Sequence, residues 1–229
     1  MNKLEGLPKI YYINLVEATE RNQHMLNMFD KYNITNFERY EATRHAKSGH
    51  KRLSAAEFGC MISHIEVCKL IAAGDDEYAI VFEDDIDLSG IDKWQFTWND
   101  FISKMPRFDI LQIHRHQVKG FDRFKLKKWE VFDHSTAGYV ITKSYARGIV
   151  SLYERNKSSL SGFKSLSKAV GPVADFSMFY HGNAYSSCIL NVVDLPSQIV
   201  VHKGPVIEEA YKLIYEMFEN DFSIDDIIK

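Results

Sequence analysis

Residues 78–88, YAIVFEDDIDL, decide how the rest of the chain is interpreted, because an apolar run ends there in a group of acids. The first five residues have the length and the β-branched and aromatic content of a buried strand. Glu83, Asp84, Asp85 and Asp87 follow within five positions. Carboxylates at a strand end are costly to bury without a positive partner, which could be a metal, an arginine or only water.

Alternation along this strand would place Glu83 and Asp85 on one face and Asp84 on the other. Ligands bind at the carboxyl ends of strands in open α/β sheets. Two hard oxygen ligands on one face suit Mg²⁺ or Mn²⁺ bridging to substrate phosphates. A solubilising turn, in which Asp84 or Asp85 caps a helix, is the alternative.

The patterns on either side of this strand alternate between strand and helix. Thr19 could cap one helix, and another opens with Ser54 and Glu57 spaced as a capping box and ends at Gly74. Alternation of this kind predicts an α/β sandwich with a mainly parallel sheet and helices on both faces. The expected strands are 9–15, 37–42, 78–84, 108–114 and 138–142, and a further helix is expected over 143–156.

Length and composition bound the class of protein. The 229 residues suit a single domain, 1–229, with a core over 9–202 and a helical extension over 203–229. A net charge of −3 provides no basic field for nucleic acid. The basic stretch 123–130 is either a solvated loop or an acceptor or phosphate patch. The Ser-, Gly- and Lys-containing segment 156–171 is typical of a mobile loop.

The cysteines and the apolar runs indicate a compartment. Three cysteines without C-x-x-C spacing fit a reducing environment. No signal peptide is recognisable, and no apolar run approaches the roughly 20 residues of a membrane span. We expect a soluble, cytoplasmic protein, or one that associates peripherally with a membrane without crossing it.

Six motifs in order give the sequence a family resemblance. It resembles glycosyltransferase family 25, the lipooligosaccharide-type glycosyltransferases of lipopolysaccharide biosynthesis, across about residues 9–202. The motifs are INLVEATERN (13–22), FERYEA (37–42), LSAAEFGCMISH (53–64), IVFEDDIDL (80–88), STAGYVITKSYA (135–146) and GPVADFSMF (171–179).

The resemblance implies a metal-dependent, inverting enzyme of GT-A type. Such an enzyme moves a hexose, often galactose from UDP-galactose, to a glycan or glycoconjugate acceptor. Two departures concern the donor and the base. The first turn carries Glu17 and Glu20 where basic residues are usual and keeps Arg21, and Asp175 follows Pro172 by three places where the family commonly has two.

The resemblance also suggests roles near the donor. Glu83 and Asp85 would hold Mn²⁺ or Mg²⁺, His202 would complete the metal shell, and Asp84 would bond the ribose. His202 could equally be an ordinary histidine at a strand end. Asn14 and Arg21 bracket a turn that opens a helix, which is a ready site for the donor phosphates, although Arg21 could be a surface residue.

Three residues are candidates for chemistry. Asp175 could take the acceptor proton as general base, or could simply favour the first turn of a helix. His64 and Glu57 lie seven residues apart on one helix face, and His64 is either functional or a satisfied structural histidine.

Two other functions stay open from the sequence. The first is a carbohydrate- or partner-binding module that keeps the fold and has lost catalysis. The second is a Mg²⁺-dependent phosphohydrolase, but that class needs an aspartate nucleophile directly after the first strand, where Asn14 and Leu15 stand.

Overall fold

The computed structural model describes residues 1–42, 44–115, 124–157, 160, 163, 172–193 and 218–228. His202 and most of the expected 156–171 loop and C-terminal helix lie outside these residues.

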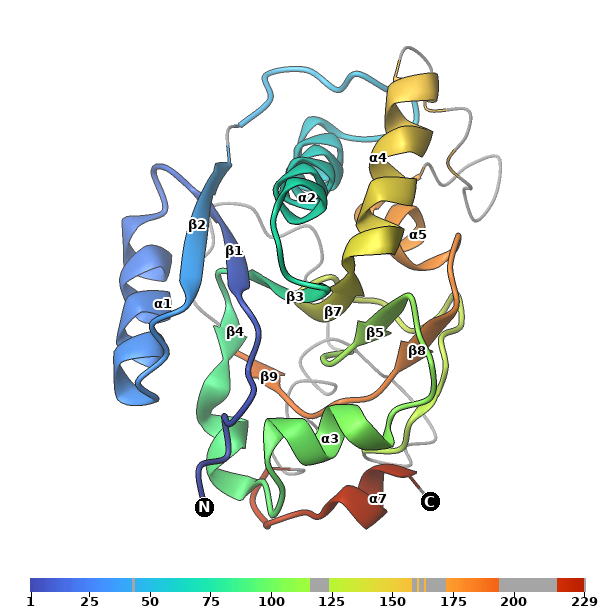
Figure 1. Cartoon of the computed structure of the whole chain (residues 1–229). Coiled ribbons are helices and arrows are strands. Elements are labelled where there is room, and N and C mark those ends of the chain that lie inside the picture. The colour runs from blue at the N-terminus through green and yellow to red at the C-terminus, as the bar shows by residue number, and fades with distance from the viewer. Residues whose placement is uncertain are drawn as a thin grey trace.

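A seven-stranded sheet forms the centre of the molecule, in the order β2-β1-β3-β7-β5-β8-β6 (Figure 1). β1 pairs in parallel with both β2 and β3, whereas β7 is antiparallel to its neighbours β3 and β5. β8 is parallel to β5, and β6 is antiparallel to β8 at the edge. Five strands therefore share one direction. The strands are β1 (Ile10–Leu15), β2 (Phe37–Ala42), β3 (Tyr78–Glu83), β5 (Ile110–Gln112), β6 (Lys127–Lys128), β7 (Gly138–Thr142) and β8 (Ala184–Ser186), and a separate pair joins β4 (Ile86–Asp87) to β9 (Asn191–Val192).

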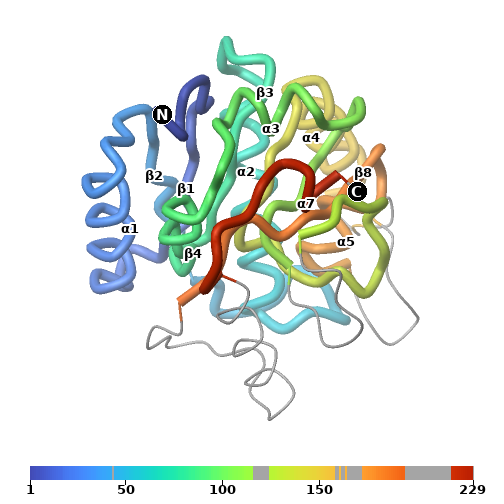
Figure 2. The backbone as a smooth tube through the Cα atoms, turned by 90° about the horizontal axis from the view of Figure 1, so that it is seen from below, coloured from blue at the N-terminus to red at the C-terminus, as the bar shows by residue number. Residues whose placement is uncertain are grey.

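Helices cover both faces of this sheet. One face packs against α2 (Ala55–Ala73), α4 (Lys143–Asn156) and α5 (Ala174–Phe179) through an apolar cluster that includes Met61, Val81, Tyr139, Ile149 and Phe179. The other face packs against α1 (Thr19–Lys31), η1 (Leu88–Lys93), α3 (Trp98–Lys104) and α7 (Ile224–Ile228) through a second cluster that includes Tyr12, Phe29, Phe82, Trp98 and Ile227. Figure 2 shows the C-terminal segment with α7 crossing this second side, where Phe222 pairs with Trp94.

This architecture confirms the predicted α/β sandwich with a mainly parallel sheet and helices on both faces. The capping box is also confirmed, because the Ser54 side chain accepts from Glu57 N and the Glu57 side chain accepts from Ser54 N. The predicted cap at Thr19 is wrong. The helix is preceded by Ala18 without a side-chain cap, and Thr19 is its first residue.

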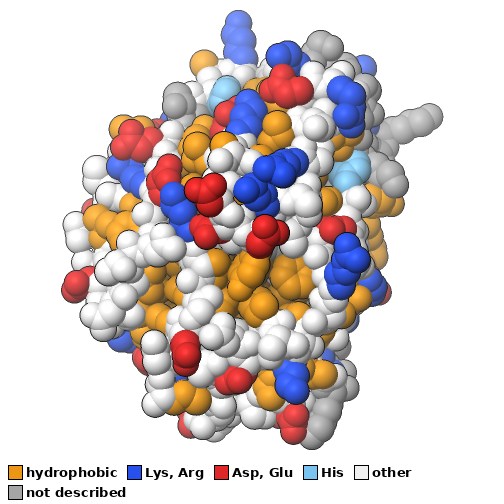
Figure 3. Space-filling model, in the orientation of Figure 1, with side chains coloured by type: hydrophobic (Ala, Val, Ile, Leu, Met, Phe, Trp, Pro, Cys, Tyr) orange, Lys and Arg blue, Asp and Glu red, His pale blue; other side chains and the backbone are white. Residues whose placement is uncertain are grey.

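The surface agrees with the small net charge. On the face drawn in Figure 3, acidic and basic side chains are mixed with apolar ones. Among the described residues, no helix combines the length and apolar character needed to cross a membrane.

Candidate active site

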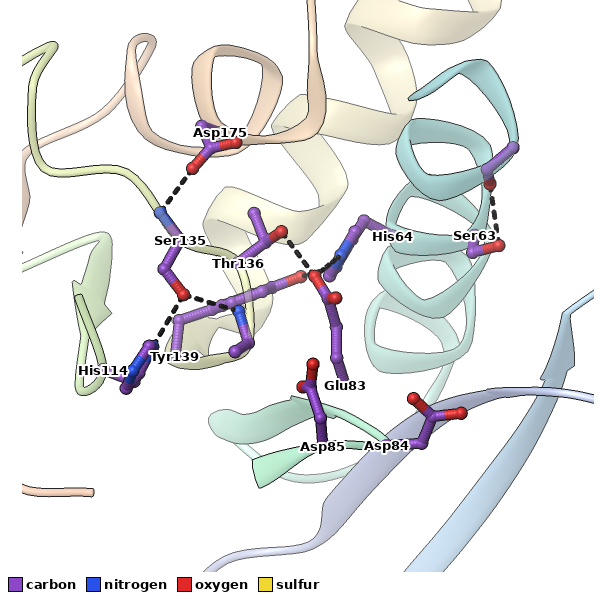
Figure 4. Close-up of polar contacts among 12 residues, drawn as sticks. Ser63, His64, Glu83, Asp84, Asp85, His114, Ser135, Thr136, Tyr139 and Asp175 are labelled. Carbon is purple, nitrogen blue, oxygen red and sulfur yellow. Dashed lines mark hydrogen bonds and ion pairs between the residues drawn. The ribbon is translucent and has the colours of Figure 1, made fainter. Parts of the chain in front are cut away.

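The acids after β3 have an arginine as positive partner. β3 ends at Glu83, and Asp84 and Asp85 form a turn rather than continuing the strand. Arg21 Nη2 on α1 lies 2.5 Å from Asp84 Oδ1 and 3.0 Å from Asp85 Oδ2. Although the strand has ended, Figure 4 shows Glu83 and Asp85 pointing into the same space with Asp84 turned away. The predicted placement of Glu83 and Asp85 on one side, and of Asp84 on the other, is therefore confirmed.

Glu83 is held by one side chain from α2 and one from the segment before β7. Its Oε1 accepts from Thr136 Oγ1 at 2.5 Å and lies 3.2 Å from His64 Nε2. The other ring nitrogen of His64 lies 2.9 Å from the Tyr139 hydroxyl. Burial raises the pKa of Tyr139, so its hydroxyl stays protonated and can donate to His64. With the Tyr139 hydroxyl donating to Nδ1, Nε2 is the ring nitrogen that donates to the Glu83 carboxylate.

The two carboxylates titrate differently because their surroundings differ. Burial would raise the pKa of Glu83, but the hydrogen bonds from His64 and Thr136, with the charge of Arg21, outweigh it and lower the pKa. Burial and then repulsion from Glu83 raise the pKa of Asp85 to about 7, against the opposing charge of Arg21. The pair therefore carries more negative charge than one arginine offsets.

A second network fixes Asp84. Asn14, at the end of β1, donates from Nδ2 to Asp84 Oδ2 at 2.5 Å and to Ala18 O at 3.1 Å. Asn14 Oδ1 accepts from Arg39 Nε and Nη2 at 3.0 and 2.6 Å. Burial raises the pKa of Asp84, with Arg21 and Asn14 opposing the shift. Asp84 thus joins the first βα turn to the end of β3.

Asp175 holds a strained segment just before β7. Asp175 Oδ1 accepts from Ser135 N at 2.5 Å (Figure 4). Ser135 has φ 140°, a region that residues with a Cβ rarely adopt and that carries strain of about 1–3 kcal/mol. Gln112 Nε2 donates to Ser135 O at 2.8 Å, and His114 Nδ1 lies 2.7 Å from Ser135 Oγ. The contacts keep Ser135 in place and present the next residue, Thr136, to Glu83.

All of these side chains except Asp175 lie within one matched region of the sequence. A family model described as glycosyltransferase family 25 (LPS biosynthesis protein) matches residues 7–160, well over half of the chain. The chain belongs to glycosyltransferase family 25. Its α/β sandwich is the GT-A-like fold expected for that family, and glycosyl transfer is the activity that membership supports.

Comparison with other proteins adds little to family 25 membership. No curated protein matches the sequence significantly. Among solved structures, it is similar to a glycosyltransferase involved in the glycosylation of the major capsid of PBCV-1, with 12% identity and a TM-score of 0.39, covering 64% of this chain and just under two thirds (66%) of that one. It is also similar to HddC from Yersinia pseudotuberculosis, with 13% identity, a TM-score of 0.40 and coverage of 94% and 80%. At these TM-scores neither likeness carries an argument.

The metal implied by the family 25 resemblance fits the oxygen atoms at the end of β3. Asp85 Oδ1 is buried and has no hydrogen-bond partner among the described residues. Both hydrogen bonds to Glu83 use Oε1. Glu83 Oε2 and Asp85 Oδ1 are therefore suitable donors for Mn²⁺ or Mg²⁺, and a cation would offset the surplus negative charge.

A second donor set shares Glu83. Ligand atoms of Cys60, His64 and Glu83 lie within 4.8 Å of one another. Sulfur and imidazole ligands suit zinc better than magnesium or manganese. Burial raises the pKa of the Cys60 thiol well above its usual value, and a protonated thiol is a poor ligand. The oxygen pair is the better match to the metals that the sequence suggests.

The structure brings most of the predicted family 25 site residues together, but not all. They form two networks that adjoin at residues 83–85. One contains Asn14, Arg21, Asp84 and Asp85, and the other contains His64 and Glu83, which Asp175 reaches through Ser135 and Thr136. Glu57 contacts the N-terminus of α2, about 10 Å along the helix axis from His64 at 1.5 Å per residue, and its catalytic role stays a prediction. His202 lies outside the described residues.

Sequence reasoning missed Arg39, Gln112, Ser135, Thr136 and Tyr139. Arg39 stands in a half-buried strand, where a charged residue usually indicates an exposed edge. Thr136 and Tyr139 reach Glu83 and His64 only because β7 lies next to β3 in reverse direction. The polar pair Ser135 and Thr136 before an expected strand was the one available signal.

Proposed function

We propose that this family 25 enzyme transfers a hexose from a UDP-sugar to a hydroxyl of a glycan or glycoconjugate, with inversion and with Mn²⁺ or Mg²⁺ as cofactor. Galactose is the hexose that the family resemblance favours. The main support for this proposal is the pair of carboxylates Glu83 and Asp85 at a strand end. One buried oxygen of Asp85 lacks a hydrogen-bond partner among the described residues.

The donor side of the reaction uses residues of the first half of the chain. Glu83 and Asp85 would hold the metal, which neutralises charge on the leaving diphosphate when bound. Arg21 Nε is buried without a hydrogen-bond partner among the described residues, so the guanidinium has donor capacity left for a phosphate oxygen. Asn14 positions Asp84, the candidate for the ribose. His64 acts through Glu83, which it orients.

The acceptor side uses Asp175. Its Oδ1 is taken by Ser135 N–H, so Oδ2 is the atom proposed to accept the proton. The acceptor oxygen forms the new bond to the anomeric carbon, the bond from that carbon to the diphosphate breaks, and the hydroxyl proton passes to Asp175. Attack opposite to the leaving group inverts the anomeric centre.

Calorimetry with UDP-galactose, UDP-glucose and UDP-N-acetyl sugars, with and without Mn²⁺, tests this proposal. We expect UDP-sugar binding to require Mn²⁺, and Asp85→Ala to weaken it at least 100-fold because half of the carboxylate pair is lost. Asp76→Ala is the matched control, since Asp76 is exposed near the other end of β3. Metal-independent binding, or equal affinity for wild type and Asp85→Ala, would overturn the metal assignment.

A further inference from the structure

A concave site lies at the far end of α5 from Asp175. It is a cavity of about 610 Å³ formed by segment 128–132, the end of α5 and the start of β8. This volume is within the usual range for small-molecule sites. Tyr180 follows Asp175 by five residues, about 7.5 Å along the helix axis. Asp175 does not line the cavity, and this length of helix separates the candidate base from it.

Aromatic rings form much of this cavity. Trp129 stacks on Phe179 with ring centroids 5.6 Å apart and an interplanar angle of 19°, and meets Tyr180 edge-on at 6.3 Å. Phe132 and Tyr180 are 73% and 39% exposed. They are the only aromatic residues among the large exposed hydrophobic side chains of the described chain, and both line this cavity. Two exposed rings at one cavity require an explanation that scattered surface residues do not.

Polar groups at the rim are held in place. Lys128 donates to Asn183 Oδ1, and its ammonium lies 3.9 Å from the centroid of the Tyr185 ring. Asn183 N donates to Asp109 Oδ2 at 2.8 Å. The Trp129 indole N–H donates to Asp133 O at 3.0 Å, and Gln112 Nε2 donates to the same carbonyl and to Ser135 O. The cavity wall is thus continuous with the segment that Asp175 holds.

We propose that this cavity is an acceptor subsite that binds a sugar unit of an oligosaccharide whose terminal hydroxyl reaches Asp175. A pyranose has an apolar C–H face that packs on an aromatic ring and a rim of hydroxyls that hydrogen-bond to polar groups. The rings of Trp129, Phe132 and Tyr180 offer the first kind of contact, and Lys128, Glu130 and Asn183 offer the second. The inference rests on the proposed glycosyl transfer and places its acceptor.

Tryptophan fluorescence gives a direct test, because the chain has three tryptophans and Trp94 and Trp98 are each only 1% exposed. The probes are lactose, maltotetraose and the core oligosaccharide released from a lipooligosaccharide. We expect at least one to change the emission saturably, through Trp129. Phe132→Ala and Tyr180→Ala should each raise the Kd about three- to tenfold, the size of one lost aromatic contact.

Two controls make the result specific. Phe132→Tyr keeps the ring and should bind as wild type does, and Leu70→Ala removes an exposed apolar side chain that does not line the cavity. UDP binding with Mn²⁺ is measured on every variant and should not change.

The outcomes separate the two proposals. No response to any probe, or wild-type affinity in both Phe132→Ala and Tyr180→Ala, would overturn the subsite. Oligosaccharide binding without UDP binding in the wild type would leave the subsite and overturn the proposed transfer.

Discussion

The acid cluster at the carboxyl end of β3 and the aromatic cluster of η1 and α3 are built on opposite principles. In the acid cluster, Glu83 and Asp85 face one another and Arg21 balances them only in part. In the aromatic cluster, Trp94 stacks on Phe96 with centroids 5.2 Å apart, and the Trp94 N–H donates to Ile189 O.

This difference indicates that the aromatic cluster contributes stability and that the acid cluster serves ligand binding. Every contact of Trp94 lowers the energy of the folded chain by itself, so the aromatic cluster has no need of a ligand. The acids repel one another and leave a buried oxygen without a partner among the described residues, so folding brings them together at a free-energy cost. Only a positive ligand recovers that cost, and variants should therefore behave oppositely in the two regions.

The largest effect should come from Asp175→Asn. The amide oxygen can still accept from Ser135 N–H, so packing and donor binding should persist, whereas the amide cannot take a proton. We expect turnover to fall by about 10²- to 10⁴-fold, the usual contribution of a general base. Steady-state kinetics and UDP calorimetry measure the two properties separately. Loss of UDP binding with catalysis intact would assign Asp175 to the donor site instead.

Trp94→Ala should show the reverse behaviour. Trp94 is 1% exposed and large, and truncation of such a side chain typically costs about 3–5 kcal/mol. Urea unfolding should show this loss, while the folded fraction at low temperature should bind UDP and Mn²⁺ with wild-type affinity. A changed UDP affinity in the folded fraction would show that the two regions are coupled, and would contradict the separation of stability from ligand binding.

Asp85→Asn should stabilise the metal-free protein, and more so at high pH. The pKa of Asp85 is raised to about 7, so between about pH 4 and 7 the folded chain keeps a proton that the unfolded chain has lost. Wild-type stability should therefore decline as pH rises through that window, and Asn removes the decline. In EDTA we expect a gain of about 1–2 kcal/mol at pH 8 and almost none at pH 4. An equal gain at both values would disprove the charge explanation.

The smallest effects should come from the start of α2. Ser54→Ala removes one half of the capping box and should cost about 1 kcal/mol without changing UDP affinity. Glu57→Gln preserves the box, since Gln serves at that position as Glu does. We expect it to retain wild-type stability, so its turnover tests the predicted catalytic role of Glu57 apart from the cap. A loss of turnover on the scale expected for Asp175→Asn would support that role, and unchanged turnover would leave Glu57 as a capping residue only.

Much of the fold was predictable because its longer strands and helices carry clear sequence patterns. β1, β2, β3 and β7 and the helices α2 and α4 have clear periodicity or caps, and each was expected within a few residues. The two- and three-residue strands β4, β6, β8 and β9 are too short for any period to show. η1 and α3 were also missed, although Thr97 and Asp100 form a capping box that the sequence displays.

The sequence predicted the site residues that lie next to one another within one element. It did not predict contacts between residues of different elements. The acids of residues 83–85 are adjacent in sequence, so their grouping needed no topology. The contact of Arg21 with these acids depends on the position of α1, and that of Thr136 with Glu83 depends on β7. The strain at Ser135 has no sequence signature, because any residue type can precede a strand.

The reversed direction of β7 brings two parts of the chain together at the site. Because β7 begins where β1 and β3 end, it joins an N-terminal half, with Asn14, Arg21 and residues 83–85, to a later half with Asp175 and Tyr180. The matched region ends at residue 160, before the later half is complete. Under the two proposals, nucleotide recognition and glycan choice would be carried by different segments of the chain. Exchange of residues 128–132 together with 172–184 among relatives would then redirect the enzyme to a new glycan while its UDP-sugar stays the same.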